Sequence, residues 1–131
     1  MKAVVDTNVW VRFFVRDNEA QYRQAVEWFK TGRLGKRKLV LSAVVVAETC
    51  YVLDTFYHKT REEIASVWEV VLGQRWLAVA ERSVLIAMWP GYRNGWHWVD
   101  SYLWAWSGAN EGDILSFDKK LRHKVGTKKN D

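Results

Sequence analysis

The chain has 131 residues, a net charge of +5 and 49% hydrophobic residues, which is enough to form one domain with its own core. Its single cysteine excludes an internal disulfide, and it contains no apolar run of about 20 residues such as a membrane helix requires. No charged leader precedes the first apolar segment, so we expect a cytosolic protein, and the positive charge favours an anionic partner without naming one.

The first half of the sequence alternates apolar strands with helices. Residues 3–5, after Lys2, are small or β-branched, and this run predicts that residues 2–5 form a strand buried on both faces, as in a parallel sheet. Thr60 followed by Glu63 forms a capping box, which predicts the start of a helix. Apolar periodicity and turn residues predict helices over residues 8–14, 19–30, 44–57 and 61–72, and strands over residues 39–42 and 76–80.

The second half is less regular. Ser83 is predicted to cap a helix that Pro90 interrupts, and another helix is predicted over residues 97–109. Residues 113–117 predict a fourth strand, and Val125 could start a small fifth one. Strands separated by helices imply right-handed crossovers, so we expect an α/β fold with a parallel sheet of four or five strands.

Basic and aromatic residues leave the kind of partner open. We expect a single domain over residues 1–131, with a basic tail from about residue 122. Basic clusters at residues 33–38 and 122–129 could follow a phosphate backbone, or they could be a solvated loop and a polar tail. Four of the nine tryptophans fall within residues 96–106, where stacking on bases, core packing and a protein interface would each explain them.

Four acidic residues occupy places that suggest a common site. Asp6 and Asp118 each follow a predicted strand, where parallel sheets usually bind their ligands, although each could simply cap the next helix. Glu48 interrupts an apolar helix, where burial would demand a partner, and a distant basic residue could provide one. Asp100 is in the first turn of a predicted helix, which it could stabilise electrostatically. One shared site would explain all four.

Four carboxylates at one sheet edge would repel each other unless cations neutralise them. Oxygen ligands suit Mg²⁺ or Mn²⁺, which can activate a water for attack on a phosphate and stabilise the leaving oxygen. A positively charged protein with such a pocket is suited to cutting a polyanion. The sequence has no second Asp two residues after Asp6, no Gly-rich phosphate loop and no Cys/His cluster for zinc, as other phosphate or zinc enzymes would require.

At these residues the sequence resembles a PIN-domain ribonuclease, and in size and layout the toxin of a VapBC-type toxin–antitoxin pair. The resemblance rests on residues 4–10, 42–48, 99–101 and 115–119. It implies a three-layer PIN-like domain with strand order 3-2-1-4-5 and a metal-dependent endoribonuclease activity. It also implies a homodimer that is neutralised by a cognate antitoxin, whose tail reaches into the active groove.

The resemblance also implies individual residue roles. Asp6 and Asp100 would touch a Mg²⁺ or Mn²⁺ ion directly, Thr7 and Asn8 would orient Asp6, and Ser116 stands where the family usually has a threonine. The residues implied as catalytic and as ligands of one or two ions are Asp6, Glu48, Asp100 and Asp118.

Two other functions fit the same residues. A non-catalytic PIN-like module would bind RNA or a protein through its basic and tryptophan-rich surfaces, but its mark would be a missing acid and none is missing. A metal-dependent phosphatase or a 5′ nuclease acting on DNA could use the same carboxylates, although the chain has no room for the helical arch of flap nucleases. The sequence leaves open which RNA is cut and which antitoxin would bind.

Overall fold

The structure, a computed structural model, describes residues 1–122 of the chain. The chain forms two compact units, Met1–Ala80 and Glu81–Asp131, and each is described by itself. None of the helices in the described range has the length and hydrophobicity needed to cross a membrane. The fifth strand predicted near Val125 lies outside the described residues.

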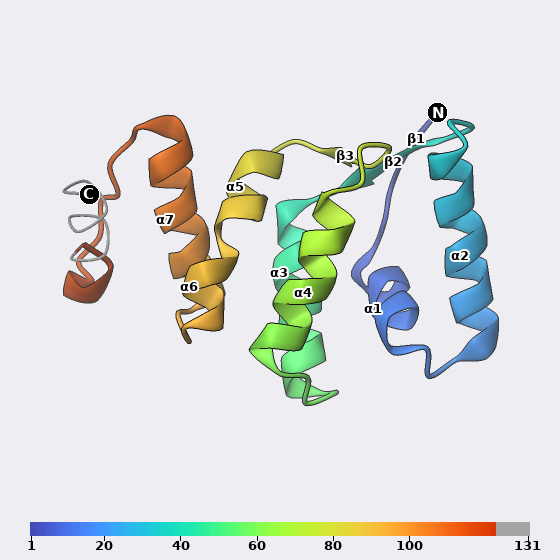
Figure 1. Cartoon of the computed structure of the whole chain (residues 1–131), viewed down its shortest axis with the longest axis horizontal. Coiled ribbons are helices and arrows are strands. Elements are labelled where there is room, and N and C mark those ends of the chain that lie inside the picture. Colours follow the sequence, from blue (N-terminus) through green and yellow to red (C-terminus); the bar gives the residue numbers. More distant parts are fainter. Residues whose placement is uncertain (123–131) are drawn as a thin grey trace. The chain divides into compact units, whose positions relative to one another are not determined.

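The first unit consists of a parallel sheet and four helices. Two helices follow each of the first two strands: the first leads away from the sheet and the second leads back to the next strand. In Figure 1 both pairs of helices lie below the strands. The seven elements are β1 (Lys2–Val4), α1 (Thr7–Val15), α2 (Glu19–Arg33), β2 (Lys38–Leu41), α3 (Ala43–Thr55), α4 (Arg61–Leu72) and β3 (Ala78–Val79).

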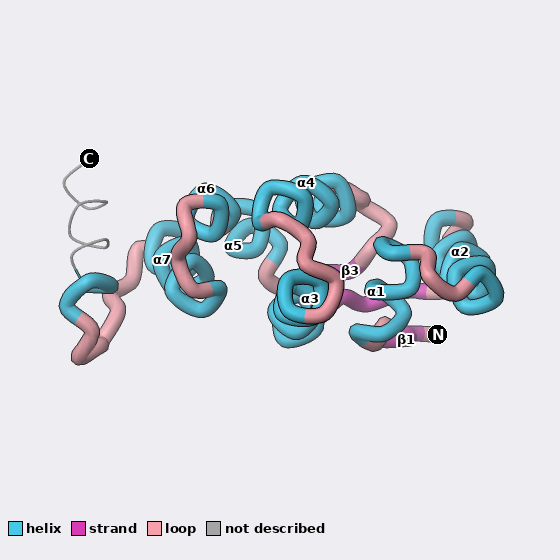
Figure 2. The backbone as a smooth tube through the Cα atoms, turned by 90° about the horizontal axis from the view of Figure 1, so that it is seen from below, coloured by secondary structure: helices cyan, strands magenta, loops and turns pink. Residues whose placement is uncertain are grey.

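The sheet confirms the predicted fold class, because its strands are parallel and helices flank it (Figure 2). β2 is central and pairs with both neighbours, with Ala3 opposite Leu39 and Val40 opposite Ala78. The three strands therefore follow the 3-2-1 part of the predicted order. One expectation is wrong: β1 is not buried on both faces, since Val4 is 66% exposed.

An aromatic cluster holds α1 in place. The ring of Trp10 lies 4.7 Å from that of Phe29 on α2 and 5.3 Å from that of Trp68 on α4, measured between ring centroids. Phe14 also packs edge-on against Trp68. Trp10 and Trp68 are 1% and 0% exposed, so these two tryptophans serve core packing, one of the roles left open by the sequence.

The second unit contains α5 (Arg82–Ala87), α6 (Trp89–Arg93) and α7 (Trp98–Asn110). The predicted cap at Ser83 is wrong, because α5 begins at Arg82. Pro90 separates the first two helices as predicted, and it lies in the first turn of α6, where its missing N–H costs nothing. Tyr102 on α7 donates a hydrogen bond to Glu81, and burial together with this bond raises the pKa of Tyr102 to about 12.

The predicted fourth strand does not form within the described residues. Residues 113–117 do not pair with any of the described strands, and Leu115 and Phe117 are 97% and 103% exposed. A strand needs a hydrogen-bonded neighbour, and the described elements of this unit are all helices. The sheet described here therefore has three strands, although four or five were predicted.

The predicted capping box at the start of α4 is confirmed. The Glu63 N–H donates to Thr60 Oγ1 and the Thr60 N–H donates to Glu63 Oε1, each over 3.1 Å. Accepting the Thr60 N–H also lowers the pKa of Glu63.

Thr60→Ala should lower the free energy of unfolding by about 1 kcal/mol, because it leaves an N–H at the helix terminus without its acceptor. Urea denaturation followed by circular dichroism measures this change. Ser66→Ala, on the exposed face of the same helix, serves as the control and should cost less. Equal midpoints for Thr60→Ala and the wild type would show that the cap contributes nothing.

Candidate active site

Asp6 lies just beyond β1 and begins α1. Its Oδ1 accepts the backbone N–H of Thr7 over 2.8 Å, so Asp6 is the N-cap of this helix, as one reading of the sequence predicted. The side chain is exposed, and Oδ2 has no hydrogen-bond donor among the described residues. Capping therefore uses only part of this carboxylate and leaves an oxygen open to solvent at the end of the strand.

Glu48 lies in the middle of α3, and the expectation that it is buried is wrong. The buried face of α3 consists of Val46, Thr49, Cys50 and Leu53. Glu48 lies on the opposite, exposed face between Val44 and Tyr51, which are 76% and 62% exposed. An apolar sequence on most sides of a helix does not bury every residue, because the packing decides which face is covered.

Thr7 connects these two acids. Its backbone N–H donates to Asp6, and its hydroxyl donates to Glu48 Oε1. Thr7 and Glu48 are 41 residues apart along the chain, and Thr7 is 7% exposed. A neutral hydroxyl, rather than the distant basic residue considered from the sequence, is thus the partner of Glu48.

The two acids line one groove of about 410 Å³. The loop after β1 and the start of α1 form one wall, and the exposed face and end of α3 form the other. The residues that line the groove are Asp6, Thr7, Asn8, Val11, Arg12, Glu48, Val52, Phe56 and Tyr57.

Arg12 is the basic residue of this groove and is held in a fixed network. Its Nη1 donates to Tyr57 Oη over 2.9 Å and to Asp17 Oδ1 over 3.1 Å, and its Nε donates to Gln21 Oε1 over 2.7 Å. Tyr57 in turn donates to Asp17 Oδ2. The bond with Tyr57 raises the pKa of Arg12 and lowers that of Asp17, so both groups stay charged at neutral pH.

Arg12 and Tyr57 are not among the site residues predicted from the sequence. Arg12 is four residues after Asn8 and therefore lies on the same side of α1, a signal that could have revealed it. Tyr57 is 45 residues from Arg12 and follows the end of α3, so no local spacing connects the two.

The other two predicted acids belong to the second unit. Asp100 lies in the first turn of α7, as predicted, and is half-buried. Asp118 Oδ1 accepts the backbone N–H groups of Lys120 and Leu121 over 2.9 and 3.3 Å, so it caps the helical turn that follows. Ser116 Oγ accepts the N–H of Asp118 over 2.9 Å. The capping role considered from the sequence is thus confirmed for Asp118.

The donor set of the groove fits a hard cation. Asp6 and Glu48 supply carboxylate oxygens that face solvent, and Mg²⁺ and Mn²⁺ are usually held by one or two carboxylates together with water. Within either unit, the described residues include no group of three or more His, Cys, Asp or Glu side chains that could hold a metal. The first unit by itself therefore offers a pair of acidic ligands.

A comparison with protein families places these features in context. The sequence matches the family model of the PIN domain over residues 3–126. This range includes all four predicted acids and almost the entire chain. No curated protein and no solved structure matches the sequence. The match extends over more than half of the chain, and the parallel sheet flanked by helices agrees with it. The chain belongs to the PIN domain family.

Proposed function

We propose that the protein is a metal-dependent endoribonuclease that hydrolyses RNA phosphodiesters. Membership in the PIN family indicates a nuclease-type module that acts on nucleic acid, because PIN domains are generally metal-dependent nucleases. The observation that supports the proposal most directly is the convergence of Asp6 and Glu48 on one solvent-open groove, with Thr7 bonded to both.

Asp6 and Glu48 would hold Mg²⁺ or Mn²⁺ in this groove. When bound, such an ion supplies the activation of a water and the stabilisation of the leaving oxygen. Thr7 keeps one oxygen of each carboxylate engaged, which restricts the rotation of both side chains. We propose Asp100 and Asp118 as further ligands on the family resemblance, since the matched residues 3–126 include both.

The surroundings of the groove suit an anionic substrate. Arg12 lies in its wall, and a neighbouring hollow of about 300 Å³ is lined by Asp6 and Arg37 among others. The net charge of +5 favours the approach of a polyanion to the whole chain. Arg12 would contact a phosphate while its bonds to Tyr57 and Asp17 hold it in position.

Cleavage of total RNA by the purified protein tests the proposed activity. With Mg²⁺ or Mn²⁺ we expect discrete cleavage products, and with EDTA we expect none. Cleavage that continues unchanged in EDTA would contradict a metal-dependent mechanism. Absence of cleavage with either metal would favour a PIN-like module that binds without cutting.

Removal of the Thr7 hydroxyl tests the positioning of Glu48. Thr7→Val keeps the shape of the side chain and leaves Glu48 without its donor, so we expect the cleavage rate to fall by about 10- to 100-fold, as for other groups that orient metal ligands. The Mg²⁺ concentration needed for half-maximal rate should rise with it. Thr7→Ser restores a hydroxyl and should recover most of the rate. Equal Mg²⁺ dependence in all three proteins would contradict this role.

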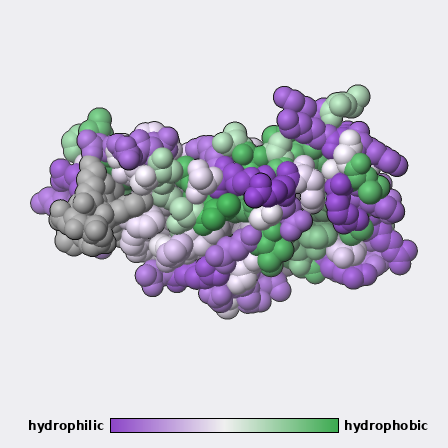
Figure 3. Space-filling view, turned by 45° about the horizontal axis from the view of Figure 1, so that its top comes forward, coloured by the Kyte–Doolittle hydropathy of each residue, from purple (hydrophilic) through white to green (hydrophobic). Residues whose placement is uncertain are grey.

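We further propose that the protein is the toxin of a toxin–antitoxin pair and acts as a cytoplasmic homodimer. The exposed face of α3 supports a protein partner at the groove, because Val44, Tyr51 and Phe56 are 76%, 62% and 69% exposed around Glu48. On the face of the molecule drawn in Figure 3, hydrophobic residues gather in patches between hydrophilic ones. A small open reading frame beside this gene, whose product co-purifies with the protein and inhibits cleavage, would support the pairing.

A further inference from the structure

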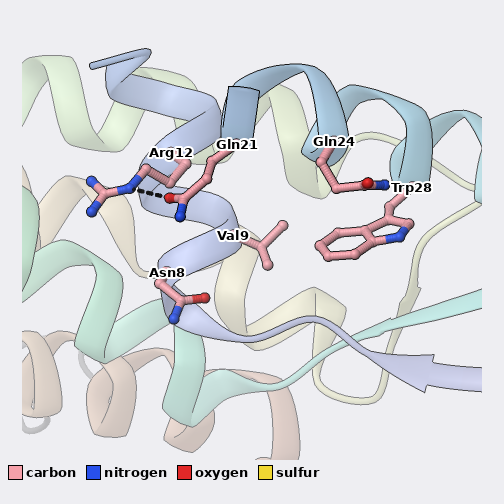
Figure 4. A pocket seen from close by; sticks show the side chains of 6 residues that line it. All are labelled: Asn8, Val9, Arg12, Gln21, Gln24 and Trp28. Atoms are coloured by element: carbon pink, nitrogen blue, oxygen red, sulfur yellow. Dashed lines mark hydrogen bonds between the residues drawn. The ribbon is translucent and has the colours of Figure 1, made fainter. Parts of the chain in front are cut away.

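A further pocket opens between α1 and α2, beside the groove that contains Asp6. It has a volume of about 270 Å³ and is lined by Asn8, Val9, Arg12, Gln21, Gln24 and Trp28. Figure 4 shows the indole of Trp28 beside Val9, with Gln24 next to it and with Asn8 and Arg12 on the other side of Val9. Asn8 and Arg12 also line the larger groove, so the two hollows adjoin.

Trp28 differs from the tryptophans of the core. It is 41% exposed, whereas Trp10, Trp68 and Trp89 are at most 1% exposed. It takes part in none of the ring contacts found among the described residues, although the neighbouring Phe29 lies in the aromatic cluster. A large planar ring that is open to solvent on the wall of a pocket can stack with another ring.

Apart from the guanidinium of Arg12, the polar side chains of the pocket are amides. Gln21 Oε1 accepts from Arg12 Nε, which leaves the NH₂ group of Gln21 as a donor. The side-chain amides of Gln24 and Asn8 have no hydrogen-bond partner within the described part of the chain. Amides offer both donors and acceptors, and they match the edges of nucleobases.

We infer that this pocket binds one base of the RNA substrate, stacked on Trp28 and contacted at its edge by the amides of Gln21 and Gln24. The inference rests on the proposed function, since it places the base next to the groove where the phosphodiester would be cut. Proteins that recognise single-stranded RNA commonly combine aromatic stacking with hydrogen bonds to the base edge and a basic group at the backbone. Trp28, the two glutamines and Arg12 supply these three elements. The pocket is slightly smaller than the sites of drug-sized ligands, which suits a single base.

RNA binding without cleavage tests the inference. A fluorescently labelled single-stranded RNA of mixed sequence is titrated with the Asp6→Asn variant in EDTA, and binding is followed by fluorescence anisotropy. Adding Trp28→Ala should weaken the affinity by about tenfold, the effect expected for loss of one base–aromatic stack. Adding Trp28→Phe keeps a ring and should recover most of the affinity. Circular dichroism of each variant verifies that it is folded.

A half-exposed tryptophan outside the pocket provides the matched control. Trp106 on α7 is 36% exposed, and Trp106→Ala should leave the affinity unchanged. Equal affinities for Trp28→Ala and its parent would overturn the inference, as would a loss of affinity confined to Trp106→Ala.

Homopolymeric RNAs then test the reading of the base edge. Gln24→Ala should change the order of preference among oligomers of A, C, G and U. An unchanged order would remove Gln24 from the inferred contact. Because none of these measurements uses catalysis, they are independent of the cleavage assay. If the wild type cleaves RNA but Trp28→Ala does not change the affinity, the base pocket alone is rejected. If Trp28→Ala weakens binding tenfold but the wild type does not cleave RNA, the proposed function alone is rejected.

Discussion

Asp6→Asn should lower the rate of RNA cleavage by about 10³-fold and leave the fold intact. Loss of a charged metal ligand removes several kcal/mol of transition-state stabilisation, and each 1.36 kcal/mol corresponds to a factor of ten in rate. Asparagine is as good an N-cap as aspartate, so the variant should still accept the N–H of Thr7 and keep α1 folded. Single-turnover cleavage of a defined RNA, with Mg²⁺ and with Mn²⁺, measures the effect.

The control for this experiment removes the same charge elsewhere in the first unit. Asp54 is an exposed residue near the end of α3 and is not among the residues that line the groove. Asp54→Asn should therefore cleave at nearly the wild-type rate. If Asp6→Asn and Asp54→Asn cut equally fast, Asp6 is a cap without a catalytic role.

Trp68→Ala should lower the free energy of unfolding by about 3–5 kcal/mol, the usual cost of truncating a large aromatic residue in a core. Trp68 is 0% exposed and contacts Trp10 and Phe14 of α1. This decrease is a large part of the total free energy of unfolding of a typical domain, which is about 5–15 kcal/mol. Because these rings hold α1 in place, and with it Asp6 and Thr7, cleavage should also decline at temperatures where the variant is partly unfolded.

Two substitutions separate the contribution of this contact from that of any tryptophan. Trp68→Phe should cost less, because a ring remains and because the indole N–H of Trp68 has no acceptor among the described residues. Trp28→Ala removes a half-exposed tryptophan from the same unit and should cost about 1 kcal/mol or less. Urea denaturation followed by circular dichroism compares the three variants. Equal midpoints for Trp68→Ala and Trp28→Ala would contradict the role of the cluster.

Local features of the fold could be predicted from the sequence. The helices α1 to α4 begin within one residue of the predicted positions, and the capping box of Thr60 and Glu63 is formed. Asn94-Gly95, a residue pair typical of turns, forms a turn, with Gly95 at a φ of +91°, a conformation that glycine adopts without strain. These features depend on contacts between residues close in sequence, so the pattern of residue types is sufficient to predict them.

The candidate site could be predicted only in part. Its acids stood out because the sequence places Asp6 after an apolar strand and Glu48 in an apolar helix. For Asp6 and for Asp118, the alternative to a role in the site was the capping of a helix, and the structure confirms that each residue is a cap. Capping and catalysis do not exclude each other, since a cap engages one oxygen of a carboxylate. No spacing in the sequence indicated that Thr7 would donate to Glu48 or that Trp28 would stay open to solvent.

The sequence by itself determined the family, the order of the helices and the parallel arrangement of the first strands. The order of the helices could be predicted because apolar periodicity, caps and turn residues act over a few positions. The family could be predicted because the four acidic segments stand in the order on which the resemblance to PIN domains rests. Tertiary structure alone decided which side of α3 is covered, that Val4 stays exposed, that residues 113–117 pair with none of the described strands, and which side chains surround Asp6. Burial and pairing depend on surfaces contributed by distant parts of the chain, so they follow from packing and not from local sequence.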